Sequence, residues 1–399
     1  MQLSVRVVRA LLAACLTGAP ALAGVLPEDR ADVLYHRYQG GGITIQGPSV
    51  LVRKKLGDSF SLSANYYEDM ISSASIDVQL SASPYHETRK QKSLSVDYLH
   101  GKSTYSAGII NSKEPDYKSD TAYYSISQDM FGDLTTVTMS YHRGWDRVYK
   151  DLKDAATGAI INDSKFNGGL GFAIADHRGY ALALSQIVTR NMILGLNYEA
   201  ITDEGYLANP YRNIRYFDPT VPGKQFTLAD QVYPRTRTSN AAAAQLKYFL
   251  PYRAALSGQY RYFRDTWGIT AHTVELGYTH PAWKHWIFDG SLRYYRQGAA
   301  DFYSDLFPRA NYSNFMARDR ELAAFHSFTL GIGASYEFSV PRAPWINKSS
   351  ANVRFDRLMI DYSDFRNALL AGQRGFTAGN EPLYKLDANI FQVFVSIWF

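Results

Sequence analysis

The chain has 399 residues, and its 42 lysines and arginines against 37 aspartates and glutamates give a formal net charge of +5. A charge this close to balance is not that of a nucleic-acid-binding protein. Aromatic residues are abundant, with 30 tyrosines and 21 phenylalanines, yet the mean hydropathy is only −0.26. Beyond residue 23 no stretch approaches the roughly 18 consecutive apolar residues of a transmembrane helix, so we do not expect one.

The amino-terminal segment is typical of a secretory signal peptide. Arg6 and Arg9 precede an apolar run, Ala10–Ala23, that ends on small residues. A charged start, a short apolar stretch and a small-residue cleavage site are the features of such a leader. We therefore expect residues 1–23 to be cleaved off and residues 24–399 to form the mature protein, with a net charge of +3 once the two arginines are lost.

Cys15, the single cysteine, leaves a second processing route open. Leu12–Cys15 is similar to the site at which lipoproteins are processed, with the cysteine as the lipidated residue. This route is the weaker one, because only about five apolar residues separate Arg9 from Cys15 and a leader core normally has about 7–15. Cleavage after Ala23 would leave no cysteine, which excludes disulfide bonds, thiolate catalysis and cysteine-ligated metals.

Downstream of the leader, polar and apolar residues alternate with a period of two, as in β-strands. In Phe60–Asp69 every second residue from Phe60 to Tyr66 is apolar or aromatic and the residues between are polar, and Met192–Asp203 and Phe328–Phe338 follow the same pattern. Strands with one side in lipid and the other in water have this pattern. The alternative is a soluble β-sandwich or a large lipocalin-like barrel with its apolar face inward.

The pattern predicts an all-β protein, a transmembrane antiparallel β-barrel of about 16 strands. Fifteen strands can be placed directly, and a short strand at Ala31–Gln39 completes the even number that single-chain bacterial barrels have. In Ala351–Ser363 the alternation slips near Arg357, which suggests a bulge. The fifteen strands are Ile43–Leu56, Ser59–Asp69, Lys92–His100, Ser103–Ser112, Thr121–Phe131, Leu134–Arg147, Gly179–Thr189, Met192–Asp203, Asn240–Leu250, Arg253–Thr266, Ile269–His280, Trp286–Gln297, Phe325–Val340, Ala351–Ser363 and Leu383–Phe399.

Short and long connections alternate, which orients the barrel. Two-residue links such as Gly57-Asp58 and Gly101-Lys102 are expected to be periplasmic turns, and the long polar stretches between them external loops. Tyr149–Asp176 is less polar than a freely solvated loop, so we expect it to fold into the pore as a constriction; a hairpin extending above the membrane is the alternative. The other long external stretches are Met70–Lys90, Glu114–Asp120, Gly205–Thr238, Gly298–Arg320 and Arg366–Glu381.

Sixteen strands leave room for a water-filled channel. The alternation places charged residues of both signs on the lumen side, where opposed rows could impose a transverse field on a solute. The alternative is that these side chains satisfy one another and water, and their near balance indicates no clear anion or cation filter. The candidate lumen-lining residues are Asp97, Glu199, Lys247, Arg261, Glu275, Asp289, Arg293, Glu337, Arg354 and Asp356.

The chain closes on an apolar segment, Val393–Phe399, that ends on an aromatic residue. It is similar to the closing strand of a bacterial outer-membrane barrel, in which the terminal aromatic is read by the barrel-insertion machinery. Phe399 is therefore the predicted insertion signal. We expect this machinery and outer-membrane lipid as partners, no nucleic acid, and localisation to the outer membrane of a Gram-negative bacterium.

Several motifs, together with these features, resemble an uncharacterised bacterial family, domain of unknown function 3570. They include Pro27–Tyr38, Gly47–Lys55, Ser72–Asp77, Ala82–Tyr85 and Asn197–Tyr206. The resemblance implies an outer-membrane protein without an assigned activity. It also suggests a small lipoprotein, a thioredoxin-like periplasmic protein and a flavin transferase as functional neighbours, and assigns no catalytic residues.

Three classes of function remain to be weighed. We expect a channel or export component for a small hydrophilic solute, with a non-conducting assembly or redox-pathway component as the alternative. An enzyme is not expected: Ser140 and His142 share a face, but at about 7 Å apart they are too far for a hydrogen bond. Asp29, Asp32 and His36, like the acidic residues between Asp116 and Asp120, could be read as cation sites, but acidic loop residues are usually solvated. No cofactor, metal site or catalytic residue is predicted.

Overall fold

The computed structural model describes residues 24–72, 86–153 and 160–399. The predicted signal peptide, residues 1–23, lies outside the described residues, as do parts of two predicted external loops. No helix in these described ranges is long and apolar enough to cross a membrane.

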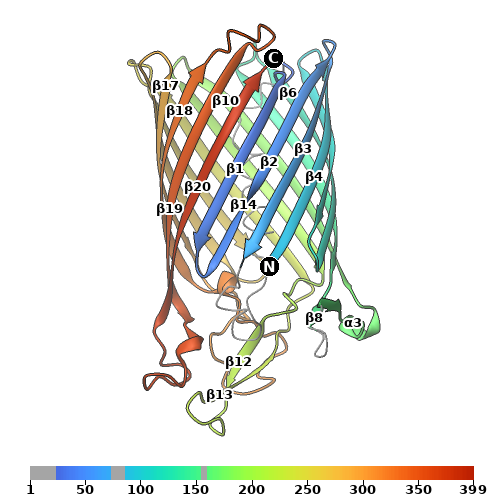
Figure 1. Ribbon diagram of the computed structural model, residues 1–399, viewed down its shortest axis with the longest axis vertical. Coiled ribbons are helices and arrows are strands. Elements are labelled where there is room, and N and C mark those ends of the chain that lie inside the picture. Colours follow the sequence, from blue (N-terminus) through green and yellow to red (C-terminus); the bar gives the residue numbers. More distant parts are fainter. Residues whose placement is uncertain (1–23, 73–85, 154–159) are drawn as a thin grey trace.

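Sixteen antiparallel strands in the described part of the chain form one closed barrel, in which β20 pairs with β1 (Figure 1). The predicted count is confirmed, including the short first strand. The barrel strands are β1 (Arg30–Gly40), β2 (Ile43–Leu56), β3 (Phe60–Ser72), β4 (His86–His100), β5 (Ser103–Lys113), β6 (Tyr117–Met130), β7 (Thr135–Val148), β10 (Ala173–Thr189), β11 (Met192–Gly205), β14 (Thr236–Phe249), β15 (Ala255–Asp265), β16 (Thr270–Ala282), β17 (Trp286–Gln297), β18 (Phe325–Phe338), β19 (Lys348–Arg366) and β20 (Leu383–Trp398).

The two faces of the barrel wall differ as the alternation predicts. Large apolar side chains such as Leu94, Ile109 and Ile332 are exposed on the outer face, where 53%, 62% and 66% of each is accessible. On the inner face of β3, Ser61 and Ser63 are buried. An apolar outside and a polar inside are stable only with lipid around the barrel, so the fold is a transmembrane antiparallel β-barrel of the bacterial outer-membrane type.

At one end of the barrel, tight hairpin turns link neighbouring strands. Gly57 and Gly101 lead two of these links with φ values of +66° and +58°, and a Cβ at either position would meet nothing within 4 Å. Glycine is therefore needed there for its backbone conformation alone. Figure 1 places the carboxy-terminal end of β20 at this end, the one predicted to be periplasmic, with β8 (Asp151–Lys153), β12 (Asn213–Phe217) and β13 (Phe226–Asp230) beyond the opposite end, predicted to be external.

At the external end several strands are longer than predicted. β4 begins at His86, β10 begins at Ala173, and the stretch predicted as a loop from Glu114 to Asp120 contains only a three-residue turn before β6 begins at Tyr117. Above the lipid both faces of a strand contact water or protein, so the apolar alternation ends while the backbone pairing continues.

The predicted bulge near Arg357 is wrong. Arg357 pairs in register with Leu330 and Asn389, and the register of β19 with β20 shifts only between Asp361 and Arg366. The pattern slips because the inward residues of β19 become apolar here: Leu358 packs against a buried cluster inside the external end. Arg357 stays on the outer face, 3.0 Å from Asp387.

The predicted constriction from Tyr149–Asp176 is also wrong for its described residues. Within it β8 pairs with β9 (Ile160–Asn162), and the short helix α3 (Phe166–Gly169) follows. Figure 1 shows β8 and α3 beyond the external end of the barrel rather than inside it. Leu170 remains 66% exposed and Ile161 47% exposed, so neither of these side chains fills the pore.

Candidate functional site: the lumen and its external cap

The ten predicted lumen residues lie on strand positions that alternate with the exposed apolar positions, which places them on the inner face. The structure brings some of them together. Register aligns Glu275 with Arg293, and Arg261 lies 3.3 Å from Glu199. Lys247 and Asp97 stand apart from these pairs, and Asp97 accepts a 2.6 Å hydrogen bond from Ser106.

Arg354 is the centre of the tightest charged group in the lumen. Its guanidinium donates to Asp289 at 2.7 Å, to Asp356 at 2.8 and 3.0 Å, and to Ser291 at 2.8 Å. The strand between, β18, makes room with Gly331 and Gly333, where an added Cβ would come within 2.3 Å of Asp356 and 2.2 Å of Asp289. Two carboxylates around one guanidinium leave this part of the wall with excess negative charge.

Another polar group lines the wall formed by β7, β10 and β11, near the external end. His177 lies between two carboxylates, with Nε2 at 2.7 Å from Asp146 and Nδ1 at 2.5 Å from Asp203. Tyr117 donates its hydroxyl hydrogen to Asp146, which is fully buried. Elsewhere in the barrel, His36 on β1 makes a 2.8 Å contact with Asp69 on β3. These networks lie on fixed strands, so they are a constant feature of the external half of the lumen.

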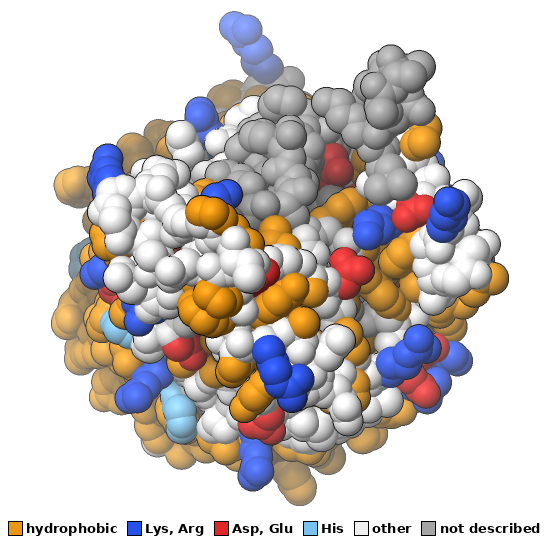
Figure 2. Space-filling model, turned by 90° about the horizontal axis from the view of Figure 1, so that it is seen from below, with side chains coloured by type: hydrophobic (Ala, Val, Ile, Leu, Met, Phe, Trp, Pro, Cys, Tyr) orange, Lys and Arg blue, Asp and Glu red, His pale blue; other side chains and the backbone are white. Residues whose placement is uncertain are grey.

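Three external loops assemble into one body, which we call the external cap: residues 206–235, 298–324 and 367–382. Apolar packing joins the first two loops, because Tyr233 and Phe302 meet edge to face with Trp267 at centroid distances of 5.4 and 5.2 Å. A second buried cluster joins Ile214 to Phe307 and Met316. Figure 2, seen from the external end, shows hydrophobic side chains interspersed with acidic and basic ones across this face.

Buried ion pairs fasten the three loops to one another. Arg215 on β12 is fully buried and binds Asp305 of the second loop and Glu381 of the third. Burial alone would lower the pKa of Arg215, but the two carboxylates outweigh burial and raise it. Arg318 adds a 2.8 Å bond to Asp305 and stacks on Phe365 at 4.4 Å. The cap therefore has the fixed interior of a small folded unit.

A second buried group lies deeper in the cap. Arg212 binds Glu321 and lies 3.2 Å from Asp319, and Gln231 and Tyr233 also donate to Asp319. Burial alone would raise the pKa of Glu321, but the adjacent Arg212 and Arg320 hold it well below its usual range. Sequence reasoning missed these residues, because the loops that carry them have no periodic pattern.

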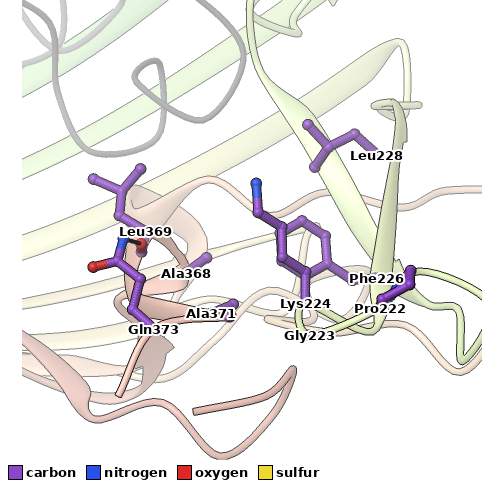
Figure 3. Close-up of a pocket in the computed structure, with 10 residues that line it drawn as sticks. Pro222, Gly223, Lys224, Phe226, Leu228, Ala368, Leu369, Ala371 and Gln373 are labelled. Atoms are coloured by element: carbon purple, nitrogen blue, oxygen red, sulfur yellow. Dashed lines mark hydrogen bonds between the residues drawn. The ribbon is translucent and has the colours of Figure 1, made fainter. Parts of the chain in front are cut away.

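A pocket of about 380 Å³ opens between the first and third loops of the cap. Figure 3 shows Leu369 and Gln373 on one side and Phe226 and Leu228 on the other, with Lys224 between them. Lys224 is the one charged side chain among its lining residues. The pocket is thus a gap between two loops of the cap, and its lining has few polar side chains that could recognise a specific ligand.

The two residues weighed for catalysis both face the lumen. Ser140 and His142 lie on the inner face of β7, and the imidazole of His142 fills the space beside Gly179, 2.0 Å from where a Cβ would lie. The adjacent residues Thr279 and His280 face opposite sides of the wall, because His280 lies on the outer face, 3.1 Å from the hydroxyl of Tyr278, whereas Thr279 points inward. Among the amino-terminal residues considered as a cation site, Asp29 binds Lys54, Asp32 binds Arg30 and His36 binds Asp69.

The last residue lies at the periplasmic rim. The backbone N–H of Phe399 donates to the carbonyl of Asp29 at 3.2 Å, its ring lies 6.3 Å from that of Trp345, and Lys54 stands 4.9 Å above it. The role of Phe399 as an insertion signal stays a prediction.

Several solved outer-membrane proteins are similar to this chain at low sequence identity. A bacterial polysaccharide outer-membrane secretin is 9% identical with a TM-score of 0.47, and the match covers 94% of this chain and 100% of that one. A FadL homologue of Pseudomonas aeruginosa is 11% identical (TM-score 0.40; 94% and 91% covered), and OccK1 of the same organism is 10% identical (0.42; 94% and 99%). No curated protein sequence matches the chain.

A family model matches residues 76–374, which is more than half of the chain. Its description is a protein of unknown function (DUF3570), the family that the sequence motifs resemble. The chain belongs to the DUF3570 family.

Proposed function

We propose that this protein is a channel or export component for a small hydrophilic solute in the outer membrane of a Gram-negative bacterium. The polar, charged inner face of a closed sixteen-stranded barrel carries the proposal. An apolar solute would have to displace water from these fixed charges without replacing their hydrogen bonds, which is costly. A polar solute would exchange one set of hydrogen bonds for another.

The mixed charges indicate which solutes pass most easily. Arg354 with its two aspartates and the Glu199–Arg261 pair offer both donors and acceptors in the lumen. A wall of this kind suits neutral or zwitterionic molecules with several polar groups better than a strongly charged anion or cation.

The second part of the proposal concerns the size of the pore, which depends on the external cap. Its interior is buried and fastened by ion pairs, so it restricts the external entrance as a folded body. We therefore expect a small or intermittently open pore.

The cap also favours the second candidate, a non-conducting barrel that acts with a small lipoprotein and a thioredoxin-like periplasmic protein in assembly or a redox pathway. Neither candidate assigns a catalytic residue or a cofactor to the chain, and neither requires nucleic acid.

Liposome swelling tests the first proposal. Refolded residues 24–399 are placed in liposomes and diluted into isotonic solutions of uncharged sugars and zwitterionic amino acids of increasing size. Swelling that falls off with solute size supports a small hydrophilic pore. Folded barrels that give no swelling with any solute would refute the channel and favour the assembly component.

A further inference from the structure

Three carboxylates converge inside the external end of the barrel. Glu87 stands at the start of β4, and Glu114 and Asp116 lie in the turn between β5 and β6. One oxygen from each lies within 4.8 Å of the others. Antiparallel pairing of β4 with β5 brings the start of one strand beside the end of the other, so the grouping is fixed by the barrel itself.

Four carboxylate oxygens of this group are buried without a hydrogen-bond partner among the described residues. Glu114 is only 2% exposed, and neither of its carboxylate oxygens accepts a hydrogen bond. One oxygen of Glu87 and one of Asp116 are orphaned in the same way. A buried carboxylate without a partner is costly, because water no longer solvates its charge. Four such oxygens in one place indicate a missing ligand.

Among the described residues, the cation beside Glu114 is Arg89, which does not fill that need. Nε of Arg89 lies 3.8 Å from Glu114, too far for a hydrogen bond. That nitrogen donates to Ser112 at 3.0 Å, and another nitrogen of the same guanidinium donates to Gln91 at 2.8 Å. Arg89 therefore offsets part of the negative charge while leaving the carboxylate oxygens free.

A contact with the external cap holds Asp116 in place. Tyr211 of the external cap hydrogen-bonds to Asp116, and its hydroxyl oxygen accepts the backbone N–H of Asp151 at 2.8 Å. Asp116 is thereby held between the barrel wall and the cap. Burial raises the pKa of Glu114 to about 7 and that of Asp116 to about 6, and neighbouring acidic groups add to the rise.

We propose that Glu87, Glu114 and Asp116 bind a divalent cation, with Ca²⁺ as the best fit. All the ligand atoms are carboxylate oxygens, which hard cations prefer, and the group contains no histidine or cysteine to favour zinc or copper. Ca²⁺–oxygen distances of about 2.3–2.6 Å allow ligands up to about 5 Å apart, whereas Mg²⁺ at about 2.0–2.1 Å demands a tighter set. Water completes the coordination. The inference is independent of the transport proposal.

Direct binding measurements test the site. Refolded residues 24–399 are stripped with EDTA, exchanged into detergent free of lipopolysaccharide, and titrated with Ca²⁺, Mg²⁺, Mn²⁺ and Zn²⁺ by calorimetry, with bound metal counted by mass spectrometry. We expect one Ca²⁺ per chain, with a Kd between about 10⁻⁵ and 10⁻³ M. Glu114→Gln, which keeps the side-chain size, should weaken binding at least tenfold.

Glu204→Gln is the matched control, because Glu204 is an exposed carboxylate at the same end of the barrel. It should bind Ca²⁺ like the wild type. If Glu114→Gln fails to show the heat-modifiable mobility of a folded barrel, Asp116→Asn takes its place. Absence of stoichiometric Ca²⁺, Mg²⁺ or Mn²⁺ binding, equal Ca²⁺ affinity in wild type and variant, or binding of Zn²⁺ alone would each overturn the proposal.

Discussion

Removal of the guanidinium of Arg215 should open the external cap without unfolding the barrel. Arg215 is fully buried on β12 and joins Asp305 and Glu381, which belong to the other two loops. Arg215→Met leaves Glu381, also fully buried, without its cationic partner. Asp305 keeps the 2.8 Å bond from Arg318, so the loss falls mainly on Glu381.

The size of the effect follows from that burial. Breaking a buried ion pair by removing one partner costs about 3–5 kcal/mol, because the remaining charge is uncompensated. Solvent screening does not reduce this value here, since neither side chain is exposed. The population of the opened cap should therefore rise by about 10²- to 5 × 10³-fold. The barrel strands lose no contact.

Limited proteolysis of the refolded protein measures this opening. We expect cleavage within residues 206–235 and 298–324 to accelerate in Arg215→Met, while the heat-modifiable mobility of the barrel stays unchanged. Arg309→Met is the matched control, because Arg309 is exposed and donates only to main-chain oxygens. In the double variant Arg215→Met/Glu381→Gln no buried charge is left unpaired, and most of the protection should return. Equal cleavage rates in wild type and Arg215→Met would refute the reasoning.

Three further predictions concern the lumen, the acidic group and the lipid face. Arg354→Met leaves Asp289 and Asp356 uncompensated, so the reversal potential in a KCl gradient should shift towards cation preference. The control, Arg357→Met on the outer face, should leave the reversal potential unchanged. A shift towards anion preference would contradict the placement of Arg354 in the lumen. The raised pKa values of Glu114 and Asp116, about 7 and about 6, mean that the folded chain binds extra protons, so in EDTA stability should fall as the pH rises from about 4 to about 7. This fall should be smaller in Glu114→Gln when the midpoint of thermal unfolding is compared across that range, and a larger fall would contradict the pKa assignment. Ile332→Arg places a charge on the lipid face and should cost about 2–4 kcal/mol in urea unfolding from lipid, against little for the inward Ser335→Arg; equal costs would reverse the assignment of faces.

The membrane-spanning part of the fold could be predicted because lipid imposes a simple rule on it. Every second residue must be apolar, so segments such as Phe328–Phe338 show their two faces in sequence. The rule fails wherever lipid is absent. Leu358 turns inward to an apolar cluster at the external end, and the same effect made the pattern near Arg357 look like a bulge.

The external cap and the acidic group could not be predicted for a different reason. The partners of Arg215 lie 90 and 166 residues away in loops without periodicity. Asp116 was considered as a cation ligand together with residues up to Asp120, but Asp120 bonds to Asn111 instead. The true neighbours of Asp116, Glu87 and Glu114, meet it through the register of adjacent strands, which the sequence leaves open.

Single-channel recording tests the central claim most directly. Refolded residues 24–399 are inserted into a planar lipid bilayer, and conductance and reversal potential are measured under a salt gradient. Our account predicts discrete open steps of small conductance, only weak ion selectivity, and longer openings in Arg215→Met. A correctly folded, heat-modifiable barrel that stays silent, both as wild type and with the cap loosened, would contradict it.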